Sequence, residues 1–266
     1  MDHTEPCCRI LLTGFDPFGG ETVNPALEAV KRVQCPGLSV VPLEVPTVFG
    51  RAEETVIQAI RAHQPQLVIC VGQAAGRAVI TPERVAINVD DARIPDNAGA
   101  QPQDRPIDPA GPAAYFSTFP IRAMVQAIRQ AGVPADISNS AGTFVCNHLM
   151  YSVLHYAAKA CPGLRAGFVH VPCIPAQTEG SALPSLPLED IVRGLEAAVL
   201  AGYAICFQNL INICGNSNLC YRPMEPALEM GLYLVRKKYQ VFSRAAERFL
   251  QVLQQQIGLQ EGQAAE

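Results

Sequence analysis

RILLTGFDPFGGETVNPALEAVKRV, residues 9–33, joins a short apolar run, a glycine-rich turn and a helix start in direct succession. Arg9 to Leu12 has the length and composition of a buried strand. Asn24 and Pro25 form a typical helix start, because asparagine caps the first turn and proline fits its first position. The helical pattern continues to about Val33, so this stretch predicts a strand–turn–helix unit.

The same alternation continues along the chain. Further apolar runs look like strands at Leu38 to Val45, Gln66 to Val71, Ala135 to Ser138 and Ala166 to Val171. Helical patterns separate most of them; one begins at Pro120 and ends at Gly132, and another extends from Leu188 to Val199. This order predicts an α/β fold with a mainly parallel sheet covered by helices.

Two segments depart from this alternation. Residues 81–111 are rich in Pro, Asp, Asn and Gly around a strand-like Val85 to Val89, and long ordered excursions of this kind often carry function. After about residue 204 the period is lost until Phe242 to Ile257, which form one helix face. We therefore divide the chain into an α/β domain, 1–204, and a partly helical C-terminal extension, 205–266, without a catalytic motif.

Composition limits the class of protein. The 266 residues are 49% hydrophobic, which is enough to bury one sizeable core. A net charge of -4 without a dense Lys/Arg run argues against a nucleic-acid partner. The first ten residues, MDHTEPCCRI, lack the basic start and apolar stretch of a signal peptide, and no run approaches the ~18 apolar residues of a membrane span. We expect a soluble, cytoplasmic protein without a membrane partner.

The chain contains ten cysteines, at positions 7, 8, 35, 70, 146, 161, 173, 206, 214 and 220. They show no CxxC pairs and do not belong to a short secreted chain, so we expect them to be reduced and mostly buried in the core. Cys146 differs, because it follows the segment Ser140 to Val145 and leads into a helical run. A thiol at a helix start faces the positive end of the dipole and free N–H groups, which favours the thiolate and supplies oxyanion donors. Cys146 is thus a candidate nucleophile, and the alternative is a cysteine that packs the helix on the sheet.

A thiol nucleophile needs a base, and histidines stand at positions 3, 63, 148, 155 and 170. His148 and His155 follow Cys146 by two and nine residues on the same helix, where neither meets the thiol easily. His170 lies near the carboxyl end of a predicted strand, where open parallel sheets place their working side chains. We therefore expect His170 to be the base.

A third group would orient the imidazole. The long segment after residue 80 offers four carboxylates, Glu83, Asp90, Asp91 and Asp96. Their spacing does not choose among them, and any of them could equally be a solvated or turn-capping residue.

Two phenylalanines, Phe15 and Phe18, stand among the glycines of the first turn. The turn has neither the GxGxxG nor the GKS/GKT pattern of a phosphate-binding loop. The two rings either wall a small flat ligand or cap the core.

With these residues in view, the chain resembles the pyroglutamyl peptidase I, or pyrrolidone carboxylate peptidase, family of cysteine peptidases. The resemblance runs from about Arg9 to about Gly202. Its motifs, in order, are LLTGFDPFGGETVNP at 11–25, VPTVF at 45–49, VGQAAGR at 71–77, ITPERVAIN at 80–88, DARIPDN at 91–97, GPAAYFST at 111–118, AGTFVCNHLMY at 141–151 and GFVHVP at 167–172.

The resemblance implies that Cys146 is the nucleophile, that His170 is its base and that Glu83 orients the histidine. It implies that Phe15 and Phe18 sandwich the pyrrolidone ring. It also implies a pocket lined by Gln73, Ile94 and Phe144, and an oxyanion held by Arg93 beside the Cys146 backbone N–H.

The resemblance further implies a three-layer α/β/α sandwich around a twisted sheet, a homotetramer, and neither metal nor cofactor. The implied substrates are peptides with an N-terminal pyroglutamyl residue, which is released through a thioester acyl-enzyme. Two alternatives are an enzyme for another acyl group, and an inactive relative that binds or assembles through the helix Phe242 to Ile257.

Two residues depart from the family pattern. Ala75 stands where glycine is usual, and its methyl group would tighten the pocket or strain a turn that needs positive φ. Cys173 stands where an aromatic residue is common and is either a second reactive thiol or a packing residue. The extension 205–266 also continues past the expected end of this family.

Overall fold

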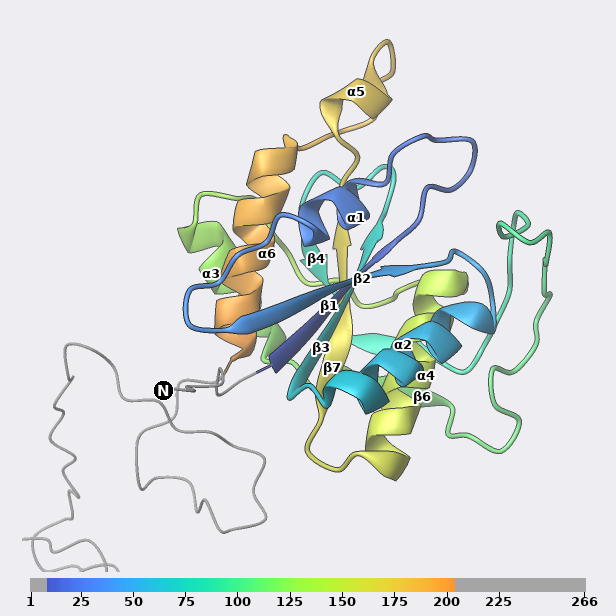
Figure 1. Cartoon of the computed structure of the whole chain (residues 1–266). Helices are drawn as coiled ribbons and strands as arrows, with labels where there is room; N and C mark the ends of the chain where they lie inside the picture. The colour runs from blue at the N-terminus through green and yellow to red at the C-terminus, as the bar shows by residue number, and fades with distance from the viewer. Residues whose placement is uncertain (1–8, 204–266) are drawn as a thin grey trace, which may run out of the picture. The chain divides into compact units, whose positions relative to one another are not determined.

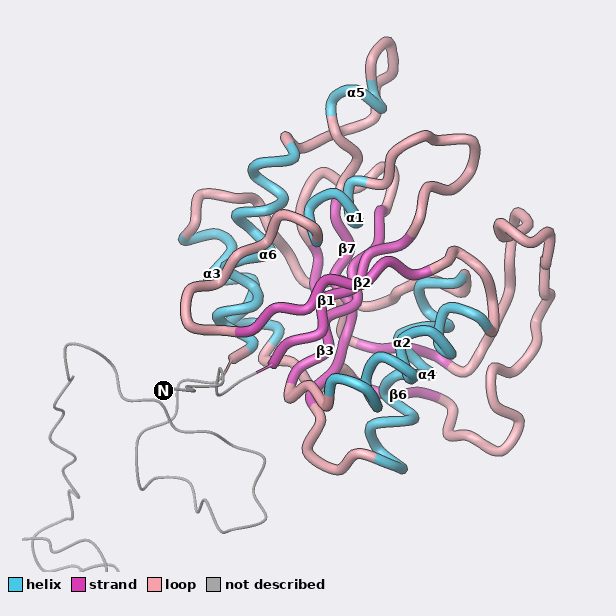
Figure 2. Tube along the Cα trace, viewed as in Figure 1, coloured by secondary structure: helices cyan, strands magenta, loops and turns pink. Residues whose placement is uncertain are grey.

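The computed structural model describes residues 9–203. A five-stranded sheet forms its centre (Figure 2), and its strands have the order β2-β1-β3-β7-β4. The parallel strands are β2 (Ser39–Val45), β1 (Arg9–Phe15), β3 (Leu67–Gln73) and β7 (Arg165–Val171). A two-residue strand, β4 (Thr81–Pro82), pairs antiparallel with β7 at one edge. The predicted extension, 205–266, and its helix Phe242 to Ile257 lie outside the described residues.

Helices cover both faces of the sheet, which confirms the three-layer α/β/α prediction (Figure 1). One face carries α1 (Pro25–Val30), α3 (Ile121–Gln130) and α6 (Leu188–Gly202), and the other carries α2 (Arg51–His63) and α4 (Val145–Ala160). The remaining elements are α5 (Pro175–Thr178) and a hairpin of β5 (Val85–Ile87) with β6 (Ala114–Phe116), which contacts α4. None of the helices within residues 9–203 has the length and apolar character needed to cross a bilayer.

The central strands are apolar on both faces. In β1, Ile10 and Leu12 enter the core beneath α1 and α6, whereas Leu11 enters the core beneath α2 and α4. In β3, Ile69 and Cys70 divide between the two cores in the same way. Because both faces are covered, these strands read as continuous apolar runs in the sequence rather than as alternating patterns.

The turn from β1 into α1 forms as the sequence predicts. The Asn24 side chain accepts a hydrogen bond from the Ala26 N–H at 3.0 Å, and Pro25 opens the helix. The helix ends at Val30, earlier than expected, and leads directly into a turn. Gly14 lets α1 lie on β1, because a Cβ at this position would be 2.6 Å from the Leu27 Cα.

The predicted strand Ala135 to Ser138 is wrong as a regular sheet strand. The segment runs beside β4 but makes only the isolated bridges Ile80 to Ala135 and Glu83 to Ser138. Between these bridges the partner residue is Pro82, which has no N–H to continue a parallel ladder. The segment is therefore extended without forming a sixth strand of the sheet.

Candidate active site

A cavity of about 640 Å³ opens at the carboxyl ends of the central strands. Most of the predicted site residues line it: Phe15, Phe18, Gln73, Arg93, Ile94, Phe144, Cys146 and His170. They come from the ends of β1, β3 and β7, the start of α4 and the long loop after β5. Glu83 is fully buried and is not part of the lining. The strand order thus gathers residues that are widely separated in the sequence.

Cys146 lies in the first turn of α4, as predicted. The next residue fixes this turn: the Asn147 carboxamide accepts from the Ile87 N–H at 2.9 Å and donates to the Ile87 and Val89 carbonyls at 2.9 and 3.0 Å. Asn147 is completely buried, so β5 anchors the start of the helix at the residue beside the thiol. Sequence reasoning did not single out this asparagine.

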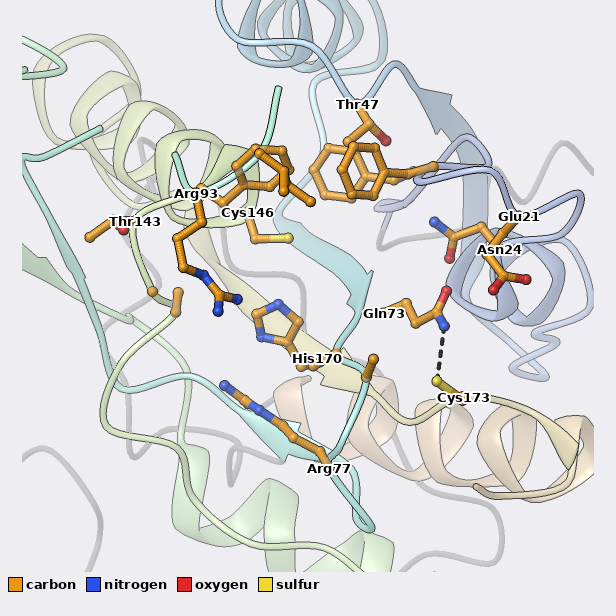
Figure 3. A pocket seen from close by; sticks show the side chains of 18 of the residues that line it. Glu21, Asn24, Thr47, Gln73, Arg77, Arg93, Thr143, Cys146, His170 and Cys173 are labelled. Atoms are coloured by element: carbon orange, nitrogen blue, oxygen red, sulfur yellow. Dashed lines mark hydrogen bonds between the residues drawn. The ribbon is translucent and has the colours of Figure 1, made fainter. Parts of the chain in front are cut away.

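Glu83 contacts His170 directly. The His170 Nδ1 lies 2.7 Å from the Glu83 Oε1, and both side chains are buried. With Glu83 ionised, Nδ1 carries the proton and Nε2 is the acceptor. Figure 3 shows the Cys146 sulfur and the His170 ring both facing the cavity, with the Arg93 guanidinium on the same side.

Burial sets the protonation states of the thiol and the imidazole. Burial, assisted by the Glu83 charge, raises the pKa of Cys146 to about 12. Burial also lowers the pKa of His170 and outweighs the hydrogen bond and charge of Glu83, which raise it. Desolvation thus opposes the thiolate that the helix start favours. Both shifts favour the uncharged forms of the thiol and the imidazole.

Glu83 is ionised in this environment. Burial alone would raise its pKa, but the hydrogen bond and charge of His170, the Ser138 side chain and the charge of Arg77 together lower it. The Arg77 Nη1 lies 2.6 Å from the Glu83 Oε1. Sequence reasoning gave Arg77 no role, although a fully buried carboxylate requires a positive partner and VGQAAGR supplies one.

The other three candidate carboxylates serve elsewhere. Asp90 lies 2.8 Å from the His148 Nδ1, and Asp96 accepts hydrogen bonds within its own loop and from the Phe49 N–H. Asp91 lines the cavity, but its main chain pairs with Thr143. Glu83 is thus the carboxylate of the four that meets His170. Within residues 9–203, no three His, Cys, Asp or Glu side chains are grouped so that they could hold a metal ion.

Aromatic rings line one part of the cavity. Phe18 packs on Phe144 with ring centroids 5.3 Å apart, and Phe15 lies 6.2 Å from Phe168. Phe15 is 3% exposed, so it belongs to the core and to the cavity wall at once. At Phe15, therefore, a ring that walls a ligand site and a ring that caps the core are the same ring.

The two departures from the family pattern both line the cavity. Ala75 is not strained, because the positive φ of this turn, 87°, belongs to Gly76. Cys173 is buried, and its sulfur accepts a hydrogen bond from the Gln73 Nε2 at 3.1 Å (Figure 3). The thiol therefore contacts one of the predicted pocket residues.

A helix-start thiol, a strand-end imidazole and a buried carboxylate behind it, on an α/β/α sandwich, define a cysteine peptidase. The chain belongs to the pyroglutamyl peptidase family, whose model matches residues 8–204.

Similar proteins agree with this assignment. The pyrrolidone-carboxylate peptidase of Levilactobacillus brevis is 59% identical over 196 residues, which cover 73% of this chain and 96% of that protein. The corresponding Streptococcus pyogenes protein is 56% identical over 196 residues, covering 73% and 91%. The crystal structure of pyroglutamyl peptidase I from Bacillus amyloliquefaciens matches with a TM-score of 0.71 and 50% identity, covering 73% of this chain and 96% of that one.

Proposed function

We propose that this protein is a cysteine peptidase that removes the N-terminal pyroglutamyl residue from peptides, with Cys146 as nucleophile, His170 as base and Glu83 as the residue that orients the base. The observation that carries the proposal is the 2.7 Å contact between Glu83 and His170 behind a cavity that also holds the Cys146 thiol. Membership of the pyroglutamyl peptidase family supplies the substrate class.

Because burial favours the uncharged thiol and imidazole, the reaction begins with transfer of the Cys146 proton to the His170 Nε2. The sulfur then attacks the pyroglutamyl carbonyl carbon, and a C–S bond forms as the carbonyl oxygen becomes an oxyanion. N–H groups at the start of α4, including that of Cys146, and the Arg93 guanidinium stabilise this charge.

Collapse of the oxyanion breaks the C–N bond. The leaving amine takes the proton from His170, and a thioester on Cys146 remains. Water, deprotonated by the same imidazole, then attacks the thioester carbonyl. The C–S bond breaks, His170 returns the proton to the Cys146 sulfur, and pyroglutamate leaves. Glu83 stabilises the imidazolium in both halves of the reaction and holds its Nδ1–H in place.

The pocket selects the lactam by excluding charge. Phe15 and Phe18 take the faces of the pyrrolidone ring, and Gln73, Ile94 and Phe144 line its edges. An ordinary N-terminus would place an ammonium group, in place of a neutral ring, against the phenylalanine walls, which costs desolvation energy. The neutral ring N–H of pyroglutamate has no such penalty.

The test is release of a fluorophore from a pyroglutamyl amide by the full-length protein and by Cys146→Ser, with and without a thiol alkylating agent. We expect alkylation-sensitive turnover in the wild type and its loss in Cys146→Ser. Cys173→Ser is the matched control, because it removes the other cavity thiol and should retain turnover. Undiminished activity of Cys146→Ser would refute the proposal.

Prolyl and alanyl amides in the same assay test the alternative acyl group that Ala75 suggests. Absence of turnover of every amide by the folded wild type would favour the alternative of a binding or assembly protein.

We also propose the catalytic unit to be residues 1–204, and the protein to be a cytoplasmic homotetramer, as the family resemblance implies. Light scattering and amide hydrolysis, on the full-length chain and on a truncation after residue 204, test the oligomeric state and the extent of the catalytic unit. The truncated chain should keep its activity and still form a tetramer. Loss of either property would assign a role to residues 205–266.

A further inference from the structure

We infer that Arg77 is a positioning residue for the base: its guanidinium holds Glu83 against His170 and keeps the imidazole neutral near physiological pH. This inference rests on the proposed function, because it concerns the proton acceptor of that reaction.

The contacts of Arg77 converge on one oxygen atom. Its Nη1 donates to the Glu83 Oε1 at 2.6 Å, and the same oxygen lies 2.7 Å from the His170 Nδ1. Arg77 also donates to the Thr81 hydroxyl and, from Nη2, to the Ser140 carbonyl at 3.4 Å. The guanidinium therefore binds the segment that precedes Glu83, at Thr81, and the extended segment beside Glu83, at Ser140. In Figure 3 it extends from the turn after β3 toward His170.

The burial of Glu83 and Arg77 explains the effect of their ion pair on His170. Glu83 is fully buried, whereas the Arg77 side chain is 28% exposed and lines the cavity. A lone buried carboxylate beside an imidazole would draw a proton onto the ring, because the pair would then be an ion pair. Arg77 already neutralises Glu83, so the ring gains less from becoming charged. The carboxylate can orient His170 without protonating it.

The charge of Arg77 acts on both proton-transfer partners. Burial is the largest cause of the lowered pKa of His170, and Arg77 adds to it. On Cys146, Arg77 opposes burial and the Glu83 charge, which raise the pKa of the thiol. The titratable and charged groups that contact this ring or line the cavity with it are Glu21, Arg77, Glu83, Asp91, Arg93, Cys146 and Cys173. Arg77 is the cation among them that contacts the Glu83 carboxylate.

The test compares Arg77→Met with Arg77→Lys, which keeps the charge. Arg84→Met is the matched control, because Arg84 adjoins Glu83 in sequence but pairs with Asn139 outside the cavity. The readout is the acidic limb of the pH profile of kcat/KM on a pyroglutamyl amide, which reports the base of the free enzyme. Two charges about 5 Å apart in a partly solvated site interact strongly enough to move this limb by about one pH unit.

We expect Arg77→Met to move the limb upward by about one pH unit, with activity largely recovered above it. Arg77→Lys and Arg84→Met should leave the limb within a few tenths of a unit. Loss of activity by the same factor at every pH, with an unmoved limb, would reduce Arg77 to a structural role and overturn the inference. Arg77→Gln is the second neutral variant if the methionine variant does not fold.

A readout independent of peptidase activity separates this inference from the proposed function. The rate of Cys146 alkylation by iodoacetamide is followed against pH by peptide mass spectrometry in the same variants. A profile moved to higher pH in Arg77→Met, but not in Arg77→Lys, supports the inference even if the wild type hydrolyses no amide. Coincident profiles would overturn it even if the wild type is a good peptidase.

Discussion

His148 lies in the interior between two carboxylates, and its replacement should remove a pH-dependent part of the protein's stability. Its Nδ1 is 2.8 Å from the Asp90 Oδ2, and its Nε2 is 3.0 Å from the Glu53 Oε2. The contact joins α4 to α2 and to the loop after β5, and the His148 side chain is only 9% exposed. The proposed perturbation is His148→Gln, which keeps a polar side chain but not the charge.

The magnitude follows from the shift in protonation. Burial would lower the pKa of His148, but the hydrogen bonds and charges of Asp90 and Glu53 raise it to about 9, from an ordinary value of 6.5. A rise in the pKa from 6.5 to about 9 corresponds to roughly 3 kcal/mol. Because the folded-state pKa is the higher one, this stabilisation is complete below about pH 6.5 and is lost as the pH rises through 9.

The assay is urea unfolding of the wild type and His148→Gln between about pH 6 and 10. The difference in unfolding free energy should be largest near pH 6 and shrink by up to about 3 kcal/mol near pH 10. It shrinks because the neutral imidazole no longer compensates the two carboxylates. His155→Gln, on the same helix, leaves the cluster intact and serves as control. A difference that stays constant, or grows with pH, would refute the reasoning.

Two further substitutions test the packing around the thiol. Gly72→Ala would place a Cβ 2.8 Å from the Phe168 Cζ and 3.1 Å from the Cys146 Sγ, so we expect about 1–3 kcal/mol of destabilisation and a fall in kcat. Thermal unfolding and amide hydrolysis measure both, and wild-type values would contradict the close approach. Asn147→Ala leaves the main chain of Ile87 and Val89 without three hydrogen bonds, so we expect a loss of about 2–4 kcal/mol in urea unfolding. A loss below about 1 kcal/mol would mean that water replaces the carboxamide.

The sequence predicts the central strands well because their physics is local. β1, β3 and β7 are buried on both faces, so each stands out as a continuous apolar run whatever its neighbours are. The pairing of the segment after Gly132 could not be judged this way. Its failure to form a regular strand depends on Pro82, a partner residue more than 50 positions away.

The choice of Glu83 could not come from local pattern for the same reason. Glu83 and His170 are 87 residues apart, and they meet because β4 pairs antiparallel with β7, placing Thr81 opposite His170. The Glu83 N–H also donates to the Phe168 carbonyl at 2.9 Å. The carboxylate is thus delivered by a sheet edge only two residues long, a feature too short to give a periodic signal.

For Cys146, the sequence predicts the position of the thiol but not its protonation state. The helix start is visible in the sequence, and the structure places the thiol there. The sequence does not show how strongly the sulfur is desolvated, and desolvation raises the pKa of the thiol against the effect of the helix start. In the proposed mechanism the sulfur loses its proton to a neutral imidazole, so the protonation state of His170 controls the reaction.

Three consecutive residues of α4 explain how the thiol is held in place. Successive helical residues point about 100° apart, so Cys146, Asn147 and His148 face three different surroundings. The first faces the cavity, the second binds the main chain of β5, and the third joins Asp90 and Glu53. Two buried polar contacts on either side of the helix axis therefore fix the rotation of the turn that carries the sulfur. The proposed mechanism depends on such fixation, because the thiol proton would pass to an imidazole whose own position is set by Glu83.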